Sequence, residues 1–253
     1  MKPWKSLVPV KIGTYVATDD AITFDLACAK TLLVGGESGS GKSCLIHHIL
    51  TSLLREHTQD ELRLLIADPK VVEYKDYENL PHLLRPIITD SEAMSESLEW
   101  LLSEYERRSE LLGKYECRNI AAFNEEVCAG TIPEEKLPNI VFVVDEFGDF
   151  AIRDDLNFEA AIVRLSALSR AYGIFLVLAT QHADRKVAGL LITDLLKCNF
   201  AARIAFRTKT SLGSKIVLEL PGAERLRERE FLFSTDATSA NPTAIKLRTF
   251  SLS

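Results

Sequence analysis

The residues best suited to chemistry lie in a glycine-rich octapeptide, Gly36–Ser43, between an apolar run and a stretch with helical periodicity. Its spacing fits the P-loop pattern G-x-x-x-x-G-K-[ST], whose backbone N–H groups cradle phosphate oxygens. Glycines let the chain turn those N–H groups inward, and a helix start adds the positive end of its dipole. The alternative is an ordinary glycine-rich turn. We expect a nucleotide to contact Gly36, Glu37, Ser38, Gly39, Ser40, Gly41, Lys42, Ser43 and Cys44.

Two side chains of this segment have specific expected roles. Lys42 would reach the β- and γ-phosphates of a bound nucleotide, where a cation offsets their charge. Ser43 would place its hydroxyl on Mg²⁺, which prefers oxygen ligands in near-octahedral geometry. The cofactors predicted from the sequence are therefore ATP and Mg²⁺.

A second apolar run, Ile140–Val144, ends in two carboxylates, Asp145 and Glu146. A carboxylate at the tip of a buried strand is costly unless a charge or a hydrogen bond meets it, and Mg²⁺ held by Ser43 would meet Asp145. Glu146 would then orient the attacking water or accept its proton. The alternative is that Asp145 only caps the helix that follows.

A third apolar run, Phe175–Ala179, is followed by Thr180 and Gln181. An amide at this point can hydrogen-bond both a γ-phosphate oxygen and the attacking water, so Gln181 is a candidate sensor of the nucleotide state. A plain turn residue is the alternative. Polar groups at neighbouring strand tips would form the crevice where open α/β sheets bind ligands.

The predicted strands and helices must bring these site residues together. Short apolar runs without alternation predict buried strands; they are Thr31–Val34, Leu62–Ala67, Ile140–Val144, Ile174–Ala179 and Ala201–Phe206. Helical periodicity falls between them, at Lys42–Arg55, Ser91–Leu112, Leu156–Ala171 and Val187–Leu196. The alternation predicts an α/β fold with a mostly parallel sheet covered on both faces. We expect one domain over residues 1–253, with a short β-hairpin (Val8–Leu26, turning at Asp19 and Asp20) within a lead-in at 1–30, a core at 31–253, and further short strands after residue 221.

Composition narrows the class of protein. The chain has 253 residues, 47% of them hydrophobic, and it has no run of about twenty apolar residues, so we expect a soluble cytoplasmic domain without a membrane span or signal peptide. Its five cysteines are scattered, with no Cys-x-x-Cys pair that would predict a zinc or redox centre. The net charge of −6 excludes nucleic-acid binding through overall positive charge.

Positive charge is nevertheless concentrated locally. Residues 182–215 hold seven basic residues and two acidic ones, an excess of five positive charges. Such a cluster could contact DNA phosphates without reading sequence; a solvated face or a contact between subunits is the alternative. Its basic members are Arg185, Lys186, Lys197, Arg203, Arg207, Lys209 and Lys215.

Taken in order, these segments resemble the motor domain of the FtsK/SpoIIIE DNA translocases. The resemblance rests on Leu32–Ser43, Ile66–Lys70, Leu80–Leu83, Glu106–Arg108, Val144–Phe147, Leu178–Gln181, Arg203–Phe206 and Pro221–Glu224. It implies a RecA-like core that assembles as a ring, commonly a hexamer, around double-stranded DNA, with ATP at the subunit interfaces. It also implies that an arginine of one subunit completes the site of its neighbour; Arg203 and Arg207 are the candidates, with Arg107 and Arg108 as rivals.

The chain departs from the family pattern in places. His182 and Ala183 stand where Arg-Pro usually follows the glutamine, and Glu228-Arg229-Glu230 replaces a customary Gly-x-Gly-Asp turn. The membrane helices, smaller motor subdomain and winged helix of chromosome-segregating members are not found in these residues. Type VII secretion ATPases share the motor but typically carry Asp-Phe-Lys-Gly where this chain has Asp68-Pro69-Lys70, which favours DNA as the cargo.

We therefore predict ATP-driven translocation of double-stranded DNA by a homo-oligomeric ring, with a larger DNA-processing or transfer machine as a further candidate partner. Lys42 would bind phosphates, Ser43 and Asp145 would hold Mg²⁺, and Glu146 would activate water, with Gln181, Arg203 and Arg207 as further catalytic candidates. Three alternatives stay open: a protein-exporting ATPase of the type VII kind, a conjugation or DNA-packaging pump, and a scaffold that binds ATP without hydrolysing it.

Overall fold

The computed structural model describes residues 8–29, 31–153, 158–181, 192–235 and 243–250. Within them, one sheet has nine strands in the order β2-β1-β9-β8-β7-β3-β6-β5-β4. The strands are β1 (Pro9–Tyr15), β2 (Ala21–Asp25), β3 (Thr31–Gly35), β4 (Leu62–Ala67), β5 (Asn139–Val144), β6 (Ile174–Thr180), β7 (Ala202–Phe206), β8 (Glu230–Ser234) and β9 (Ile245–Arg248).

The sheet has a parallel half and an antiparallel half. Strands β7, β3, β6, β5 and β4 pair in parallel, with Leu33 opposite Leu178 and Val143 opposite Val177. The predicted parallel sheet is confirmed for these five strands. Antiparallel pairing then joins β7 to β8, β9, β1 and β2, so the whole sheet is mixed.

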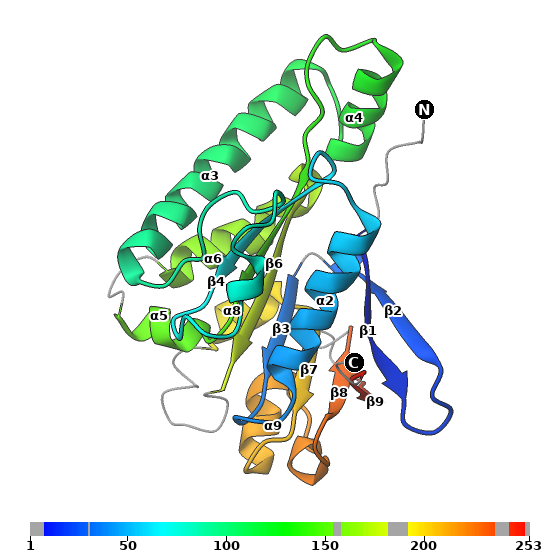
Figure 1. Cartoon of the computed structure of the whole chain (residues 1–253), viewed down its shortest axis with the longest axis vertical. Helices are drawn as coiled ribbons and strands as arrows, with labels where there is room; N and C mark the ends of the chain where they lie inside the picture. The colour runs from blue at the N-terminus through cyan, green and yellow to red at the C-terminus, as the bar shows by residue number, and fades with distance from the viewer. Residues whose placement is uncertain (1–7, 30, 154–157, 182–191, 236–242, 251–253) are drawn as a thin grey trace.

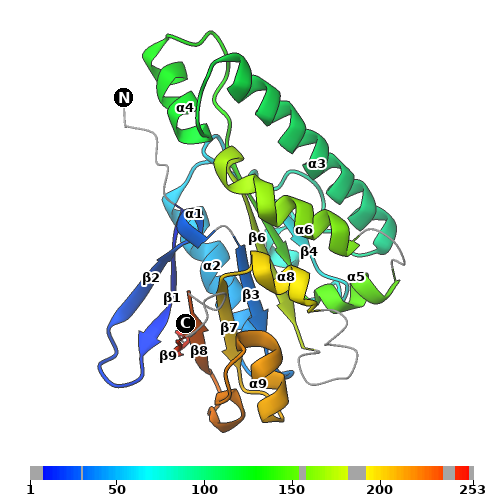
Figure 2. The same ribbon diagram turned by 180° about the vertical axis from the view of Figure 1, so that it is seen from behind.

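The buried strands alternate between two cores, one on each face of the sheet. Val141 and Val143 of β5 belong to the core that contains α2 (Lys42–Glu56), whereas Phe142 and Val144 face the opposite core. Figure 1 shows α2 on the near face, and Figure 2, from behind, shows α6 and α8 on the other. Helices therefore cover both faces of the parallel half, as the continuous apolar runs predict.

The second face is covered by several helices. They are α3 (Ser91–Lys114), α5 (Phe147–Arg153), α6 (Phe158–Leu168), α8 (Asp194–Asn199) and α9 (Ser211–Leu218). Helix α4 (Ile120–Ala129) packs beside the end of α3, as Figure 1 shows. The short elements are α1 (Leu26–Ala29) and the 3-10 turns η1 (Lys75–Tyr77), η2 (Ser169–Tyr172) and η4 (Ala223–Arg225).

Most predicted helices lie where their periodicity places them. Helices α2 and α3 begin at the predicted residues, and the helix predicted over Leu156–Ala171 is α6 followed by η2. Half of the helix predicted at Val187–Leu196 lies outside the described residues; the helix observed there, α8, begins after the N-cap Thr193 and ends at Asn199.

The N-terminal hairpin is confirmed as β1 and β2, with Asp19 in the left-handed region at φ 56°. Strand β1 also pairs with β9, so the hairpin continues the main sheet. Among the residues that the structure describes, no helix combines the length and the hydrophobicity that crossing a bilayer takes.

Candidate nucleotide-binding and catalytic site

A cleft of about 290 Å³ opens beside the start of α2, where the parallel strands end. Parallel strands put their carboxyl ends at one edge, so residues distant in sequence meet there. The lining residues are Ser38, Gly39, Gly41, Lys42, Ser43, Cys44, Lys70, Glu73, Gln181, Glu228 and Arg229.

The backbone of the predicted P-loop has the shape that its glycines permit. Gly39 and Gly41 have φ of 73° and 115°, in the left-handed region that favours glycine. A Cβ atom on Gly36 would lie 2.6 Å from the Cβ of Phe206, too close for any other residue. The loop therefore lies directly against the end of β7.

The N-terminus of α2 is open toward the cleft. Its N-cap is Gly41, which has no side chain to bond the first amides of the helix. In contrast, α3, α4, α8 and α9 are capped by the side chains of Asp90, Asn119, Thr193 and Thr210, respectively. Because the first-turn N–H groups of a helix have no carbonyl within it to bond, those of α2 can bind an anion.

Lys42 is buried in the loop that it follows, with its side chain directed back across it. Its Nζ donates to the carbonyls of Gly36 and Glu37, both at 2.8 Å. Burial lowers the pKa of Lys42 to about 8, although the carboxylates of Glu146 and Asp145 act in the opposite direction. The ammonium group is therefore held at the mouth of the phosphate-binding loop.

Asp145 follows β5 on the side of the sheet that carries α2. It is 5% exposed, and Tyr74 donates a hydrogen bond to its Oδ2 at 3.2 Å. Burial raises the pKa of Asp145 to about 6, and this hydrogen bond opposes that rise. Burial and the neighbouring carboxylate in turn raise the pKa of Tyr74 well above its usual range, so its phenol stays a donor.

The loop after β4 completes this side of the cleft. The buried carboxylate of Asp68 accepts backbone N–H groups from Lys70, Val72 and Glu73, at 2.9 to 3.1 Å. These bonds wrap the loop around one side chain and bring Lys70 and Glu73 to the cleft. The same wrap holds Val71 at φ 60°, which is rare for a β-branched residue.

Glu146 is held by the end of β6. Its Oε1 accepts the hydroxyl of Thr180 at 2.9 Å, and its two carboxylate oxygens accept the backbone N–H of Gln181 at 3.1 and 3.0 Å. Glu146 is only 2% exposed, with φ at 53°. A strained backbone at a buried carboxylate is typical of functional positions.

Arg207 contacts the P-loop of its own chain. Its guanidinium forms an ion pair with Glu37, and its carbonyl accepts the N–H of Glu37 at 2.9 Å. The Arg207 side chain is 42% exposed. The end of β7 is thus coupled directly to the phosphate-binding loop.

Arg203 has a structural role, which corrects its expected place among the catalytic and DNA-contacting residues. It is 1% exposed, and its guanidinium donates to the carbonyls of Phe200, Lys197 and Val217. Glu219 lies 3.4 Å from the same group. A guanidinium enclosed in this way cannot reach a neighbouring subunit or a DNA phosphate.

The structure describes only part of the rest of the predicted basic cluster. Arg185 and Lys186 lie outside the described residues, and Lys197 pairs with Asp194 at 3.3 Å. Of the rival arginines, Arg108 is buried against Glu104 and the carbonyl of Tyr172, whereas Arg107 is exposed beside Glu104.

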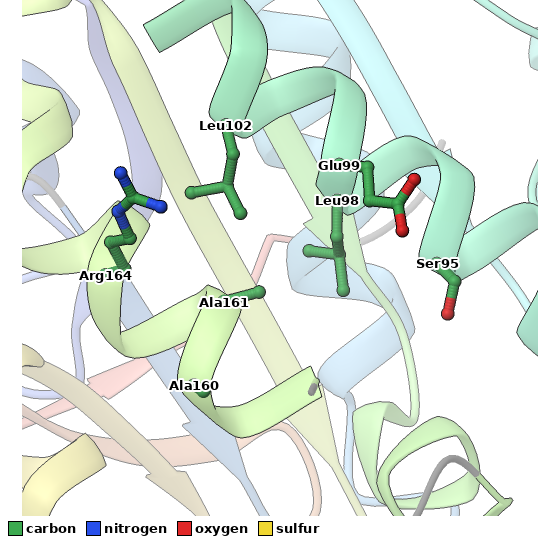
Figure 3. Close-up of a pocket in the computed structure, with 7 residues that line it drawn as sticks. All are labelled: Ser95, Leu98, Glu99, Leu102, Ala160, Ala161 and Arg164. Carbon is green, nitrogen blue, oxygen red and sulfur yellow. The ribbon is translucent and has the colours of Figure 1, made fainter. Parts of the chain in front are cut away.

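A second hollow, of about 260 Å³, lies between α3 and α6 (Figure 3). Leu98, Leu102 and Ala161 contribute apolar side chains, with Glu99 and Arg164 among the other lining residues. None of the sequence-predicted site residues lines it. This hollow therefore has no part in the chemistry predicted from the sequence.

Comparison with known proteins agrees with this geometry. The family model of FtsK/SpoIIIE matches residues 2–184. The chain belongs to the FtsK/SpoIIIE family. DNA translocase FtsK of Treponema pallidum is 39% identical over 94% of this chain, and that of Chlamydia trachomatis is 40% identical over 87%. This FtsK/SpoIIIE chain spans only 29% and 28% of those relatives, respectively.

Solved structures share the fold. The pCW3 conjugation coupling protein TcpA, solved with ATPgS, superposes with a TM-score of 0.78 at 27% identity, over 98% of this FtsK/SpoIIIE chain and 67% of that one. The cytoplasmic domain of the Thermomonospora curvata type VII secretion ATPase EccC gives 0.81 at 24% identity, over 98% and 29%. The predicted P-loop ATPase fold is therefore confirmed.

Several residues of the site were not assigned from the sequence. Tyr74 and Thr180 contact the carboxylates of Asp145 and Glu146, respectively, and Lys70 and Glu73 line the cleft. Arg229 donates its backbone N–H to the carbonyl of Ser40, with φ at 64°. The sequence held two signals for these residues. One is the Asp68-Pro69 turn, and the other is Glu228-Arg229-Glu230, which replaces a customary Gly-x-Gly-Asp turn of the family.

Proposed function

We propose that this chain is the ATP-hydrolysing motor of a translocase that moves double-stranded DNA. The observation that carries the proposal is the meeting of Lys42, Asp145 and Glu146 at one edge of a parallel sheet. An ammonium group and two acids at the end of a P-loop are the groups that phosphoryl transfer requires. We infer DNA as the cargo from relatives that are named DNA translocase FtsK.

The residues present fit ATP and Mg²⁺. The left-handed glycines and the uncapped start of α2 direct backbone N–H groups into the cleft, as a chain of phosphates requires. Ser43 and Asp145 offer hydroxyl and carboxylate oxygens, the donors that Mg²⁺ prefers. When bound there, the metal ion would supply positive charge that offsets charge on the phosphate oxygens.

Three side chains would bind phosphate, activate water and sense the nucleotide state. Lys42 would exchange the carbonyls of Gly36 and Glu37 for phosphate oxygens, which keeps its ammonium group hydrogen-bonded. Glu146 would orient the attacking water and accept its proton. Gln181 lines the cleft, where its side-chain amide would sense whether the γ-phosphate is present.

Two features favour DNA over protein as the cargo. Relatives at 36–40% identity are named DNA translocases, whereas the likeness to the EccC secretion ATPase, at 24% identity, concerns the fold. The loop after β4 is Asp68-Pro69-Lys70, without the Asp-Phe-Lys-Gly signature typical of type VII ATPases. A conjugation or packaging pump would use the same chemistry within another machine.

We infer that the active form is a homo-oligomeric ring with the ATP sites at subunit interfaces. We propose a hexamer, the ring size common in the family. Arg207 is our candidate for the arginine that acts on the neighbouring site. It is partly exposed, and it would exchange its ion pair with Glu37 for the neighbour's γ-phosphate.

Measuring ATP turnover with and without linear duplex DNA tests the proposal. We expect DNA to stimulate turnover, and we expect Lys42→Ala and Glu146→Gln to reduce it at least about 100-fold. The subunit concentration is raised until sedimentation shows that a ring has formed. Turnover that survives in both variants would contradict the assigned chemistry, and turnover indifferent to DNA would favour a protein cargo.

A further inference from the structure

The carboxylate of Glu146 is fixed by the strand that also supplies Gln181 to the cleft. The Thr180 hydroxyl and the Gln181 N–H both donate to it, at 2.9 to 3.1 Å. Glu146 and Thr180 are 2% and 1% exposed. The hydrogen bonds therefore lie in the interior, where charge-assisted bonds are strong.

This position is poorly suited to activating water. The carboxylate is almost fully buried, and the Thr180 hydroxyl and the Gln181 N–H already occupy its oxygens. A general base must come within hydrogen-bond reach of the water it activates. The carboxylate would therefore have to turn from the tip of β6 toward the cleft before it could act.

Gln181 links the cleft to the carboxylate of Glu146 at the tip of β6. Gln181 lines the cleft, and its backbone N–H donates to both oxygens of Glu146. A ligand that draws the Gln181 side chain toward itself would pull on the peptide that carries this N–H. Occupancy of the cleft would in this way weaken the hold on the carboxylate.

We propose that Thr180 is a positioning residue that, together with the Gln181 amide, holds Glu146 in a resting position, and that an occupied cleft weakens this hold without abolishing it. The proposal rests on the ATP hydrolysis proposed above. It differs from the sensor role of the Gln181 side chain because the hydroxyl of Thr180 and a backbone amide perform the restraint. Weakening the resting position shifts the population toward the active one.

The direct test is Thr180→Val, which removes the hydroxyl and keeps the shape of the side chain. We expect the kcat of ATP turnover without DNA to rise roughly 10- to 150-fold, the worth of one hydrogen bond to a charged group, while KM stays unchanged. The additional stimulation by DNA should shrink by a similar factor. Thr180→Ser, which keeps the hydroxyl, should restore the slow turnover.

Thr31→Val is the matched control. Thr31 is also fully buried on a parallel strand, and its hydroxyl donates to the carbonyl of Asn199 at 2.8 Å, at the opposite end of β3 from the P-loop. It should lose comparable stability and keep the original turnover. If the valine variant does not fold, as judged by its thermal transition, Thr180→Ala carries the same prediction.

The outcomes separate the two proposals. Turnover in the unaltered chain that does not depend on Lys42 overturns the proposed function. Turnover that depends on Lys42 but stays equal or falls in folded Thr180→Val overturns the restraint alone. A rise in kcat that serine reverses and that Thr31→Val does not reproduce supports it.

Discussion

The phenol of Tyr74 donates a hydrogen bond to Oδ2 of Asp145 at 3.2 Å, and both side chains are buried. Tyr74 lies in the loop after β4, and its ring packs 5.1 Å from that of His47 on α2. The tyrosine therefore connects the loop, the P-loop helix and the carboxylate expected to hold Mg²⁺. It also stabilises the charged form of that carboxylate against burial.

Binding of nucleotide with Mg²⁺ should have a bell-shaped dependence on pH. Asp145, with its pKa raised to about 6, must be charged to hold the metal ion, so binding is lost as pH falls through 6. Lys42, with its pKa lowered to about 8, must be protonated to meet phosphates, so binding weakens as pH rises through 8. We expect kcat/KM of the free protein to show both limbs. A flat profile from pH 5 to 9 would contradict these roles.

Tyr74→Phe should move only the acid limb of that profile. Without the phenol, the charged form of Asp145 loses a hydrogen bond, so its pKa rises and the limb shifts to higher pH. The matched control is Tyr77→Phe, because the Tyr77 hydroxyl bonds His47 at 2.9 Å. A shift in the control as large as that in Tyr74→Phe would count against the assignment.

Asp145→Asn should stabilise the nucleotide-free chain near pH 7 while abolishing binding that depends on Mg²⁺. A carboxyl whose folded pKa is raised above its unfolded value contributes stability that is present at acid pH and lost as pH rises through 6. Removing the charge should return about 1–3 kcal/mol at pH 7. In urea unfolding, this gain should vanish near pH 4; a gain that is independent of pH would contradict the cause.

Arg203→Leu should destabilise the fold. The substitution leaves the carbonyls of Phe200, Lys197 and Val217 without their donor in the interior. We expect a loss of about 3–5 kcal/mol in the free energy of unfolding. Arg225→Leu, at a side chain 86% exposed, should change it by less than about 0.5 kcal/mol. Equal effects in urea would show that Arg203 is not structural.

Mixing two inactive variants tests whether Arg207 acts across the subunit interface. Arg207→Ala keeps its own P-loop but lacks the arginine, whereas Lys42→Ala keeps the arginine but lacks a working site. Mixed rings should therefore recover ATP turnover that neither variant has alone. Mixing Arg107→Ala with Lys42→Ala tests the exposed rival in the same way, and recovery only in that second mixture would reassign the role.

The sequence was most informative where local patterns decide the structure. The limits of β4 and the first residue of α2 match their predictions, because continuous apolar runs and a P-loop leave little choice. Helices α4 and α9 were not predicted, although Asn119 and Thr210 cap them and Gly130 ends α4. Their apolar periodicity extends over only 10 and 8 residues.

Long-range contacts were beyond the reach of local patterns. Arg203 and Arg207 are four residues apart and were ranked together, yet one is buried and the other pairs with Glu37. Alternation along β7 would place both side chains on one face of the sheet, but Arg207 follows the end of the strand at Phe206. The groups that the two arginines contact come from α8, α9 and the P-loop, which local patterns do not bring together. Likewise, the contact of Thr180 with Glu146 joins two strand tips 34 residues apart in the sequence.

Movement along duplex DNA is tested most directly by displacement of a third strand bound to a linear duplex. A ring at a concentration where sedimentation shows assembly should release the third strand only with ATP and Mg²⁺, and Glu146→Gln should bind DNA without releasing it. Release that needs no hydrolysis, or hydrolysis stimulated by DNA without any release, would contradict a DNA-translocating motor.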